Sequence, residues 1–226
     1  TTIFLTSQIA PSILGVTAVI AYIYMALVPF IQPPLVKLVT TKHERSIEMK
    51  TPRDVGRTEK IILPLLAMLL IILIVPRSAP LISMFMIGNI FKESGVVPRL
   101  ADAASNEILN IATVFLMLTI GTQLSAGSVF QFATIKILIL GVVAFGISTV
   151  SGVLFAKLMN LVLKEKINPL IGAAGVSAVP MAARIAHQIA QEENPHNYLL
   201  PHAMAPNVAG VIGSAVIAGV FLAILN

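Results

Sequence analysis

The stretch that decides the fold is INPLIGAAGVSAVPMAAR, from Ile167 to Arg184. It stands among long apolar runs, yet it contains two prolines, two glycines, one asparagine, one serine and one arginine. Irregular backbone at membrane depth persists only where protein or a water-filled cavity covers it, because lipid cannot satisfy its hydrogen-bonding groups. Such a segment among apolar helices therefore predicts a transport or coupling site. The alternative is a surface loop between two helices.

The composition is that of an integral membrane protein. Of the 226 residues, 57% are hydrophobic and only 11% are charged. The mean hydropathy is +0.93, whereas about a quarter of a typical soluble domain is charged. The apolar runs are long and show no strand-like alternation, which argues against a barrel. We therefore expect an all-α integral membrane protein, a polytopic helical bundle.

Apolar runs predict where the chain crosses the membrane. A helix rises 1.5 Å per residue, so about 20 apolar residues cross the roughly 30 Å hydrocarbon core. The almost purely aliphatic run at residues 61–76 is expected to face lipid, and the first span is expected to end at Gln32, before two prolines. The expected spans are residues 12–32, 61–76, 103–124, 131–163 and 198–225.

Polar residues divide the chain into four segments. Seven lysines and arginines and four acids gather in the only long hydrophilic loop, which the positive-inside tendency places in the cytoplasm. The net charge of +5 lies mostly beside the membrane and does not indicate nucleic acid. Because the chain opens on Thr-Thr-Ile-Phe, we expect a fragment of a longer protein. The segments are 1–36, a half-helix and span ending a first repeat; 37–60, the basic loop; 61–163, scaffold and packing helices; and 164–226, a second re-entrant hairpin and the final span.

A short internal echo favours inverted repeats. Gln8-Ile9-Ala10 recurs as Gln188-Ile189-Ala190, and a polar span containing proline follows each copy. Transporter folds are commonly built from inverted repeats whose broken helices meet near the bilayer midplane. We expect broken re-entrant hairpins, the second with its tip near Ser177 to Pro180. A chance identity is the alternative.

Four neutral side chains are candidate sodium ligands: Tyr24, Asn168, Ser177 and Asn207. Sodium is a hard cation that prefers oxygen, and backbone carbonyls freed where helices unwind add further ligands. No carboxylate lies well inside a span, and a cation held only by neutral oxygens in a low dielectric is costly. We therefore expect a carboxylate from a segment preceding Thr1. Interhelical hydrogen bonding is the alternative role for each of the four.

Arg184 is the candidate anion-binding residue. It lies seven residues after Ser177, about 10 Å further along a helix. A guanidinium cannot bind sodium, but its planar fork suits a carboxylate. An arginine that reaches up to lipid headgroups is the alternative. An anion site next to a cation site predicts coupling between an anionic substrate and sodium.

Four stretches of the sequence are distinctive: NPLIGAAGVSAVPMAAR (168–184), YMALVPFIQPP (24–34), FKESGVV (91–97) and HAMAPNVAGVIGS (202–214). They resemble one family, the β subunit of the sodium-translocating carboxybiotin decarboxylases, which act on oxaloacetate, methylmalonyl-CoA, glutaconyl-CoA or malonate. The resemblance runs the full length of the chain but covers only about the C-terminal half of the family's subunit. The family's Gly-Ala-Asp-Gly-Pro pattern, whose Asp is regarded as a central sodium and proton group, would lie just before Thr1.

The resemblance implies sodium roles for Tyr24, Asn168, Ser177 and Asn207. It also implies that Arg184 serves carboxybiotin, as the catalytic and substrate-binding residue, and that Gly172 and Pro180 shape the site. The chain departs from the family at Ala205, where relatives often carry glycine before the proline; we expect little consequence.

The resemblance implies that the chain is part of an enzyme. Its membrane subunit decarboxylates carboxybiotin, consumes a proton and moves sodium outward. The implied partners are a carboxyltransferase (α) subunit, a small γ/δ membrane subunit, a biotin carrier protein and further copies of this subunit. The implied location is the bacterial or archaeal inner membrane, crossed several times. The alternatives are a sodium-coupled secondary transporter of a carboxylate, with no chemistry, and a structural anchor for soluble subunits.

Overall fold

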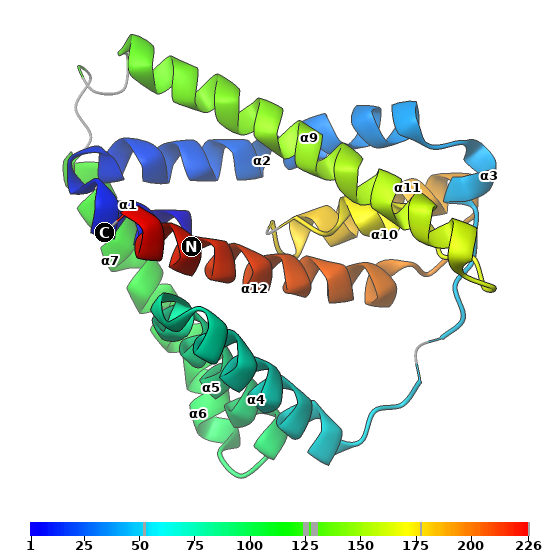
Figure 1. Ribbon diagram of the computed structural model, residues 1–226, viewed down its shortest axis with the longest axis horizontal. Coiled ribbons are helices and arrows are strands. Elements are labelled where there is room, and N and C mark those ends of the chain that lie inside the picture. The colour runs from blue at the N-terminus through cyan, green and yellow to red at the C-terminus, as the bar shows by residue number, and fades with distance from the viewer. Residues whose placement is uncertain (52, 124–126, 128–130, 177, 226) are drawn as a thin grey trace. The chain divides into compact units, whose positions relative to one another are not determined.

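The computed structural model of the chain is all-helical in the part that it describes, which is residues 1–51, 53–123, 127, 131–176 and 178–225 (Figure 1). Three short 3₁₀ or π segments, η1 (Pro11–Ile13), η2 (Pro76–Ser78) and η3 (Ala104–Ile108), join the α-helices. The α-helices are α1 (Thr2–Ile9), α2 (Leu14–Val39), α3 (Lys42–Arg45), α4 (Arg57–Ile74), α5 (Ala79–Ser94), α6 (Pro98–Ala103), α7 (Leu109–Gln123), α9 (Phe132–Val162), α10 (Leu170–Ala173), α11 (Met181–Glu193) and α12 (Leu200–Leu225).

Four helical stretches of the described chain are long and apolar enough to cross a membrane: Pro11–Val39, Pro98–Thr122, Phe132–Val162 and Leu200–Leu225. This agrees with the predicted integral membrane helical bundle. The expected span at 61–76 is not among them. Helix α4 begins with three charged residues in its first four positions, and its remaining 14 apolar residues rise only about 21 Å, which is less than the roughly 30 Å core.

Helix α2 is longer than the sequence suggested. We expected the first span to end at Gln32, but the helix continues to Val39 through Pro29, Pro33 and Pro34. Proline removes one backbone hydrogen bond and crowds the preceding turn, which usually breaks a helix. Here a buried stripe at four-residue spacing, Val28, Gln32, Val36 and Thr40, continues across the prolines. Tertiary packing of that stripe therefore outweighs the local preference of the proline pair.

The chain folds into two compact units. Unit 1 comprises Thr1–Val19, Arg53–Gln131 and Ser214–Asn226, and unit 2 comprises Ile20–Pro52 and Phe132–Gly213. Every described residue that was predicted to form the site belongs to unit 2. The four-segment division along the sequence stays a prediction.

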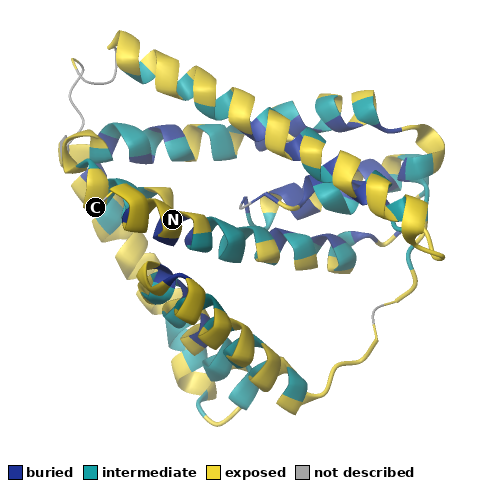
Figure 2. Cartoon of the chain, viewed as in Figure 1, coloured by how far each residue is buried: buried dark blue, intermediate teal, exposed yellow. Residues whose placement is uncertain are grey.

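In unit 1, α4 and α5 pack against each other as a pair. The side-chain amide of Asn89 donates to the Lys60 carbonyl at 3.0 Å and joins the two helices. Most apolar side chains of α4 point outward: Leu73 is 68% exposed and Ile74 is 79% exposed. Figure 2 shows the same exposed character along α7. Such surfaces are compatible with contact to lipid or to further protein.

In unit 2, the core is formed around the two short helices α10 and α11 (Figure 2). One face of α11 is buried at helical spacing, whereas Met181, Arg184 and Gln188 on its other face are exposed. The partners of the buried face come from α2, α9 and the start of α12, including Val28, Val153 and Ala203. The buried face of the segment between Asn168 and Glu193 is therefore covered by long helices, and its other face is exposed.

Candidate functional site

The helix is interrupted where the sequence stretch with glycines and prolines predicts a break. Helix α10 ends at Ala173 and α11 begins at Met181, and the described residues between them form turns and irregular backbone. The peptide bond between Val179 and Pro180 is cis. The carbonyls of Ala178 and Pro180 accept from N–H groups in the first turn of α11, at 3.0 and 3.1 Å. Those of Ala174 and Val176 accept from no described backbone N–H, so they are available to side chains or to an ion.

Glycines let the neighbouring helices approach this segment closely. A Cβ atom on Gly172 of α10 would clash with the backbone of Gly152 in α9, and the reverse clash is equally severe. A Cβ on Gly210 of α12 would lie 2.6 Å from the Gly175 carbonyl oxygen. Because only glycine has no Cβ, these positions allow backbone-to-backbone packing on both sides of the break. Gly172 thus lies in backbone contact with α9, and its role in shaping the site stays a prediction.

Asn207 of α12 reaches the irregular backbone directly. Its Nδ2 donates to the carbonyl oxygens of Ala174 at 2.8 Å and Val176 at 2.7 Å. The residue is fully buried, and its Oδ1 has no hydrogen-bond partner among the described residues. Both N–H groups of the Asn207 amide therefore bind the irregular backbone. The amide oxygen is left buried, near the carbonyls of Ala174 and Val176. That arrangement suits a hard cation.

Asn168 is also fully buried, but its hydrogen bonds all serve the protein. Its Nδ2 donates to the carbonyls of Arg45 at 2.8 Å and Ile47 at 2.9 Å. Its Oδ1 accepts from the Leu170 backbone N–H at 3.0 Å, which supports the first turn of α10. In this structure Asn168 fastens the basic loop to the base of the hairpin. An amide oxygen has two lone pairs, so one acceptor position on Oδ1 stays available.

A buried arginine, Arg45, holds the basic loop to the hairpin. In the sequence it was only one of the seven basic residues of that loop. Arg45 is 6% exposed and donates from Nη2 to Glu193 Oε1 at 2.6 Å and from Nη1 to the Thr40 carbonyl at 2.7 Å. The hydrogen bond from Arg45 lowers the pKa of the Glu193 carboxyl. Asn197 Nδ2 adds a bond to the Ile47 carbonyl at 3.0 Å. We call Arg45, Glu193, Asn168 and Asn197 the loop clamp.

One local signal could have marked this loop as ordered. Thr41 and Glu44 form a capping box at the start of α3, in which the Thr41 hydroxyl accepts from the Glu44 N–H and the Glu44 carboxylate accepts from the Thr41 N–H. The spacing Thr-x-x-Glu is readable from the sequence. The long-range partner, Glu193, is not.

The other predicted residues lie in different surroundings. Tyr24 is half-buried beside Gly141 of α9 and makes no hydrogen bond with a described residue. Arg184 is exposed, and its guanidinium has no ion pair or hydrogen bond within the described part of the chain. Ser177 lies outside the described residues. The structure therefore brings Asn207 to the break, places Asn168 at its base, and leaves the Tyr24 hydroxyl and the Arg184 guanidinium free of described partners.

Gln32 is a residue at this site that the sequence did not single out. Its Nε2 donates to the Ala182 carbonyl at 3.1 Å, in the first turn of α11. The residue is fully buried, and its Oε1 has no hydrogen-bond partner in the described structure. An amide inside an otherwise apolar helix was the available signal, but the two prolines that follow it suggested a helix end.

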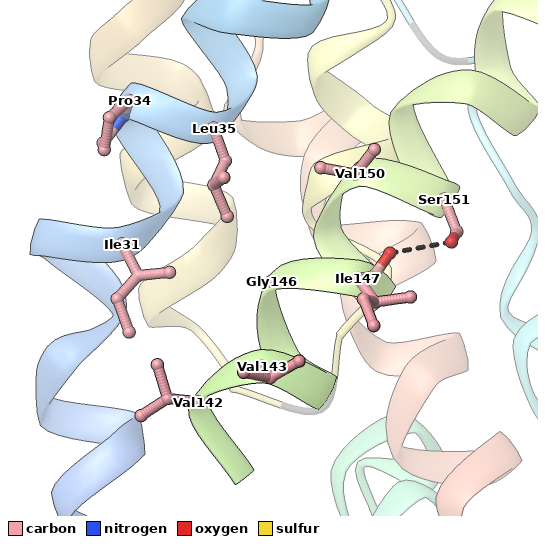
Figure 3. A pocket seen from close by; sticks show the side chains of 9 residues that line it. All are labelled: Ile31, Pro34, Leu35, Val142, Val143, Gly146, Ile147, Val150 and Ser151. Atoms are coloured by element: carbon pink, nitrogen blue, oxygen red, sulfur yellow. Dashed lines mark hydrogen bonds between the residues drawn. The ribbon is translucent and has the colours of Figure 1, made fainter. Parts of the chain in front are cut away.

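The chemistry available at the break is that of neutral oxygens. No group of three or more His, Cys, Asp or Glu side chains that could hold a metal ion occurs among the residues described. A hollow of about 570 Å³ in unit 2 lies between α2 and α9 and is almost wholly apolar (Figure 3). Its one side-chain hydroxyl, on Ser151, donates to the Ile147 carbonyl at 2.7 Å. This hollow does not suit an ion, in contrast to the buried amide oxygens.

Residues 1–225 match the family model described as Na⁺-transporting oxaloacetate decarboxylase beta subunit. The chain belongs to this family. It is 55% identical over 222 residues to "Oxaloacetate decarboxylase beta chain 2" of Salmonella typhi, covering 98% of this chain and 51% of the relative. It is also 55% identical over 226 residues to "Methylmalonyl-CoA decarboxylase subunit beta" of Propionigenium modestum, covering 100% and 57%. The corresponding subunit of Veillonella parvula is 52% identical over 226 residues, covering 100% and 61%.

The match confirms the resemblance inferred from the sequence. The chain spans about half the length of the curated relatives that it matches. Relatives of similar identity are named for two different acyl substrates, so identity alone does not select one of them.

Proposed function

We propose that the chain is the sodium-conducting and carboxybiotin-decarboxylating part of a membrane β subunit in a biotin-dependent decarboxylase. Decarboxylation of carboxybiotin is coupled to outward sodium transport and consumes a proton. The observation that supports this proposal best is a break in a helical hairpin with one buried face, next to which the oxygen of Asn207 is buried without a described partner. Membership in the family supplies the reaction class.

Sodium passes as cargo through the broken hairpin. The freed backbone carbonyls, the Asn207 oxygen and the remaining acceptor position of Asn168 are candidate ligands, together with Tyr24 and Ser177. A carboxylate from a segment of the protein outside this chain would balance the ion's charge, because neutral oxygens alone hold a cation poorly in a low dielectric.

Carboxybiotin is the anionic substrate, and Arg184 is the residue that we assign to it. An exposed arginine without a described internal partner keeps its planar fork available for a carboxylate. In the reaction the N–C bond to the carboxylate breaks, CO₂ leaves, and the electron pair remains on the ureido nitrogen, which takes up one proton. That proton comes from the sodium path, which links the chemistry to the ion.

Coupling requires that the two ligands favour different states of the hairpin. A ligand shifts a conformational equilibrium only by its difference in affinity for the two states. We propose that sodium at the break and carboxybiotin at Arg184 each bias the position of α10 and α11. The close glycine contacts with α9 and α12 are the places where the hairpin would move against its neighbours.

The remaining components follow from this role. The complex includes a carboxyltransferase (α) subunit that loads biotin, a biotin carrier protein, a small γ/δ membrane subunit and further copies of this subunit. It resides in the inner (plasma) membrane of a bacterium or archaeon.

The experiment that tests the function is decarboxylation of free carboxybiotin by the purified complex that contains this chain. We expect CO₂ release that requires sodium, together with ²²Na⁺ accumulation in proteoliposomes that avidin abolishes when the carrier-bound substrate is used. Sodium-independent CO₂ release would contradict the coupling. Avidin-insensitive sodium uptake driven by a carboxylate gradient would favour the secondary transporter instead.

A further inference from the structure

Gln32 is an unexplained buried polar group in unit 2. It lies on the buried stripe of α2, between Val28 and Val36, and is fully enclosed. Its side-chain Oε1 is, with Asn207 Oδ1, one of the two buried side-chain oxygens without a partner among the described residues. Asn207 already has a role in the proposed function. Gln32 does not.

The orientation of the Gln32 amide is fixed by its other end. Nε2 donates to the Ala182 carbonyl at 3.1 Å, so the oxygen must be the atom left over. Ala182 lies in the first turn of α11, where its carbonyl also accepts the regular bond from the N–H four residues later. The Ala182 carbonyl therefore does not depend on Gln32. A buried amide oxygen without a partner is costly, and packing alone would be served as well by methionine.

The missing partner of Oε1 must be a hydrogen-bond donor or a cation, because an amide oxygen is only an acceptor. The charged side chain nearest along the hairpin, Arg184, belongs to the exposed face of α11, whereas Ala182 belongs to its buried face. No charge from that helix face is thus directed at the amide. The Gln32 amide nitrogen is hydrogen-bonded to the arm of the hairpin that follows the break, and Asn207 is hydrogen-bonded to the irregular backbone within the break.

We propose that Gln32 Oε1 is a ligand of the transported sodium ion on its path past the start of α11, an inference that rests on the proposed function. Gln32 and Asn207 then act in the same way at two places along the hairpin. Each uses its N–H group to grip the hairpin backbone and presents its oxygen to the ion. This division also makes ion binding sensitive to the position of the hairpin.

The test uses the full-length subunit in its purified complex, with sodium-dependent CO₂ release and ²²Na⁺ uptake measured in proteoliposomes. Gln32→Met removes the oxygen but keeps the length of the side chain. We expect the sodium concentration for half-maximal rate to rise by about tenfold or more, with the rate at saturating sodium largely retained. Gln32→Glu keeps an oxygen and adds charge, and we expect tighter sodium binding with slower release.

The matched control is Asn197→Leu, which also removes a buried amide that donates to a main-chain carbonyl, that of Ile47. This substitution should lower the stability of the complex but leave the sodium concentration for half-maximal rate unchanged. If Gln32→Met assembles poorly, Gln32→Glu decides the question alone. A sodium dependence within about twofold of wild type in whichever variant assembles would overturn the proposal and indicate a bound water instead. A wild-type complex that needs no sodium would instead refute the proposed function itself.

Discussion

Among the residues of the site, Arg184 and Asn207 differ most in burial and in the hydrogen bonds that their side chains make. The Asn207 side chain is fully buried and donates to two backbone carbonyls, whereas the Arg184 side chain is exposed and makes no hydrogen bond or ion pair with a described residue. Each hydrogen bond that Asn207 makes contributes about 1 kcal/mol net to stability. Arg184 has no such contribution, so its contribution to function can be measured apart from folding.

Replacing Arg184 by alanine should therefore separate activity from stability. We expect the free energy of unfolding to change by less than about 0.5 kcal/mol, as for other surface substitutions. Turnover of carboxybiotin should fall by at least about tenfold, because the carboxylate loses a charge-assisted bidentate partner. Thermal unfolding in detergent and CO₂ release measure the two effects.

Arg184→Lys provides the comparison, since it retains the charge and loses the planar fork. It should give intermediate turnover at unchanged stability. Wild-type turnover in Arg184→Ala would exclude a role for Arg184 in binding the substrate.

At the scale of the helices, α12 contacts the irregular segment at Gly210, where the contact requires glycine. It does not require glycine at Gly213, the following glycine of the same helix. Gly210 lies against the Gly175 carbonyl, whereas Gly213 has no described atom within 4 Å of the space that a Cβ would fill. The two positions are three residues apart in one helix, so the same substitution tests opposite expectations.

Gly210→Ala should destabilise the protein by about 1–3 kcal/mol, because the added methyl group forces α12 away from the hairpin. Gly213→Ala should leave stability unchanged or raise it by about 0.5–1 kcal/mol, since alanine loses less backbone entropy in a helix. Thermal unfolding of both variants in the same detergent makes the comparison. Equal destabilisation by the two substitutions would mean that α12 does not pack on the hairpin as described.

The loop clamp predicts a pH dependence. The hydrogen bond from Arg45 holds the pKa of the Glu193 carboxyl below its ordinary value. A carboxyl whose pKa is lowered by folding stabilises the folded state above the unfolded pKa, and that contribution is lost as the pH falls through the lowered value. We therefore expect the loop at residues 40–48 to become protease-sensitive only below about pH 4.3, the ordinary pKa of a glutamate.

Glu193→Gln supplies the control, because glutamine cannot form the ion pair at any pH. Limited acid-protease digestion across the pH range should find this loop cleaved at a nearly constant rate in the variant. A wild-type loop that stays protected down to about pH 2, well below the ordinary range of a carboxyl, would show that the Arg45–Glu193 pair does not hold it.

For the whole molecule, the fold class and family followed from the sequence, but several contacts did not. Periodicity and composition predicted the helices, and the glycines and prolines predicted the break before Met181. The sequence could not reveal that α2 continues through three prolines, since the packing of Val28 and Val36 on the hairpin decides it. Likewise, the two carbonyls to which Asn168 Nδ2 donates lie more than 100 residues away, in the loop. Local sequence indicates where helices begin and end. The hydrogen bonds that a buried amide side chain makes depend instead on which distant residues the fold places beside it.

The proposed coupling makes one prediction about the whole subunit. If sodium and carboxybiotin bias the same hairpin equilibrium, linkage requires that each changes the affinity of the other by the same factor. Sodium titrations with and without a non-decarboxylatable carboxybiotin analogue should therefore differ by about 5- to 150-fold, and analogue titrations with and without sodium should differ by that same factor. Arg184→Ala should abolish the effect of the analogue on sodium binding while leaving sodium affinity alone intact. If neither ligand changes the affinity of the wild-type complex for the other, the hairpin does not couple the sodium site to the carboxybiotin site.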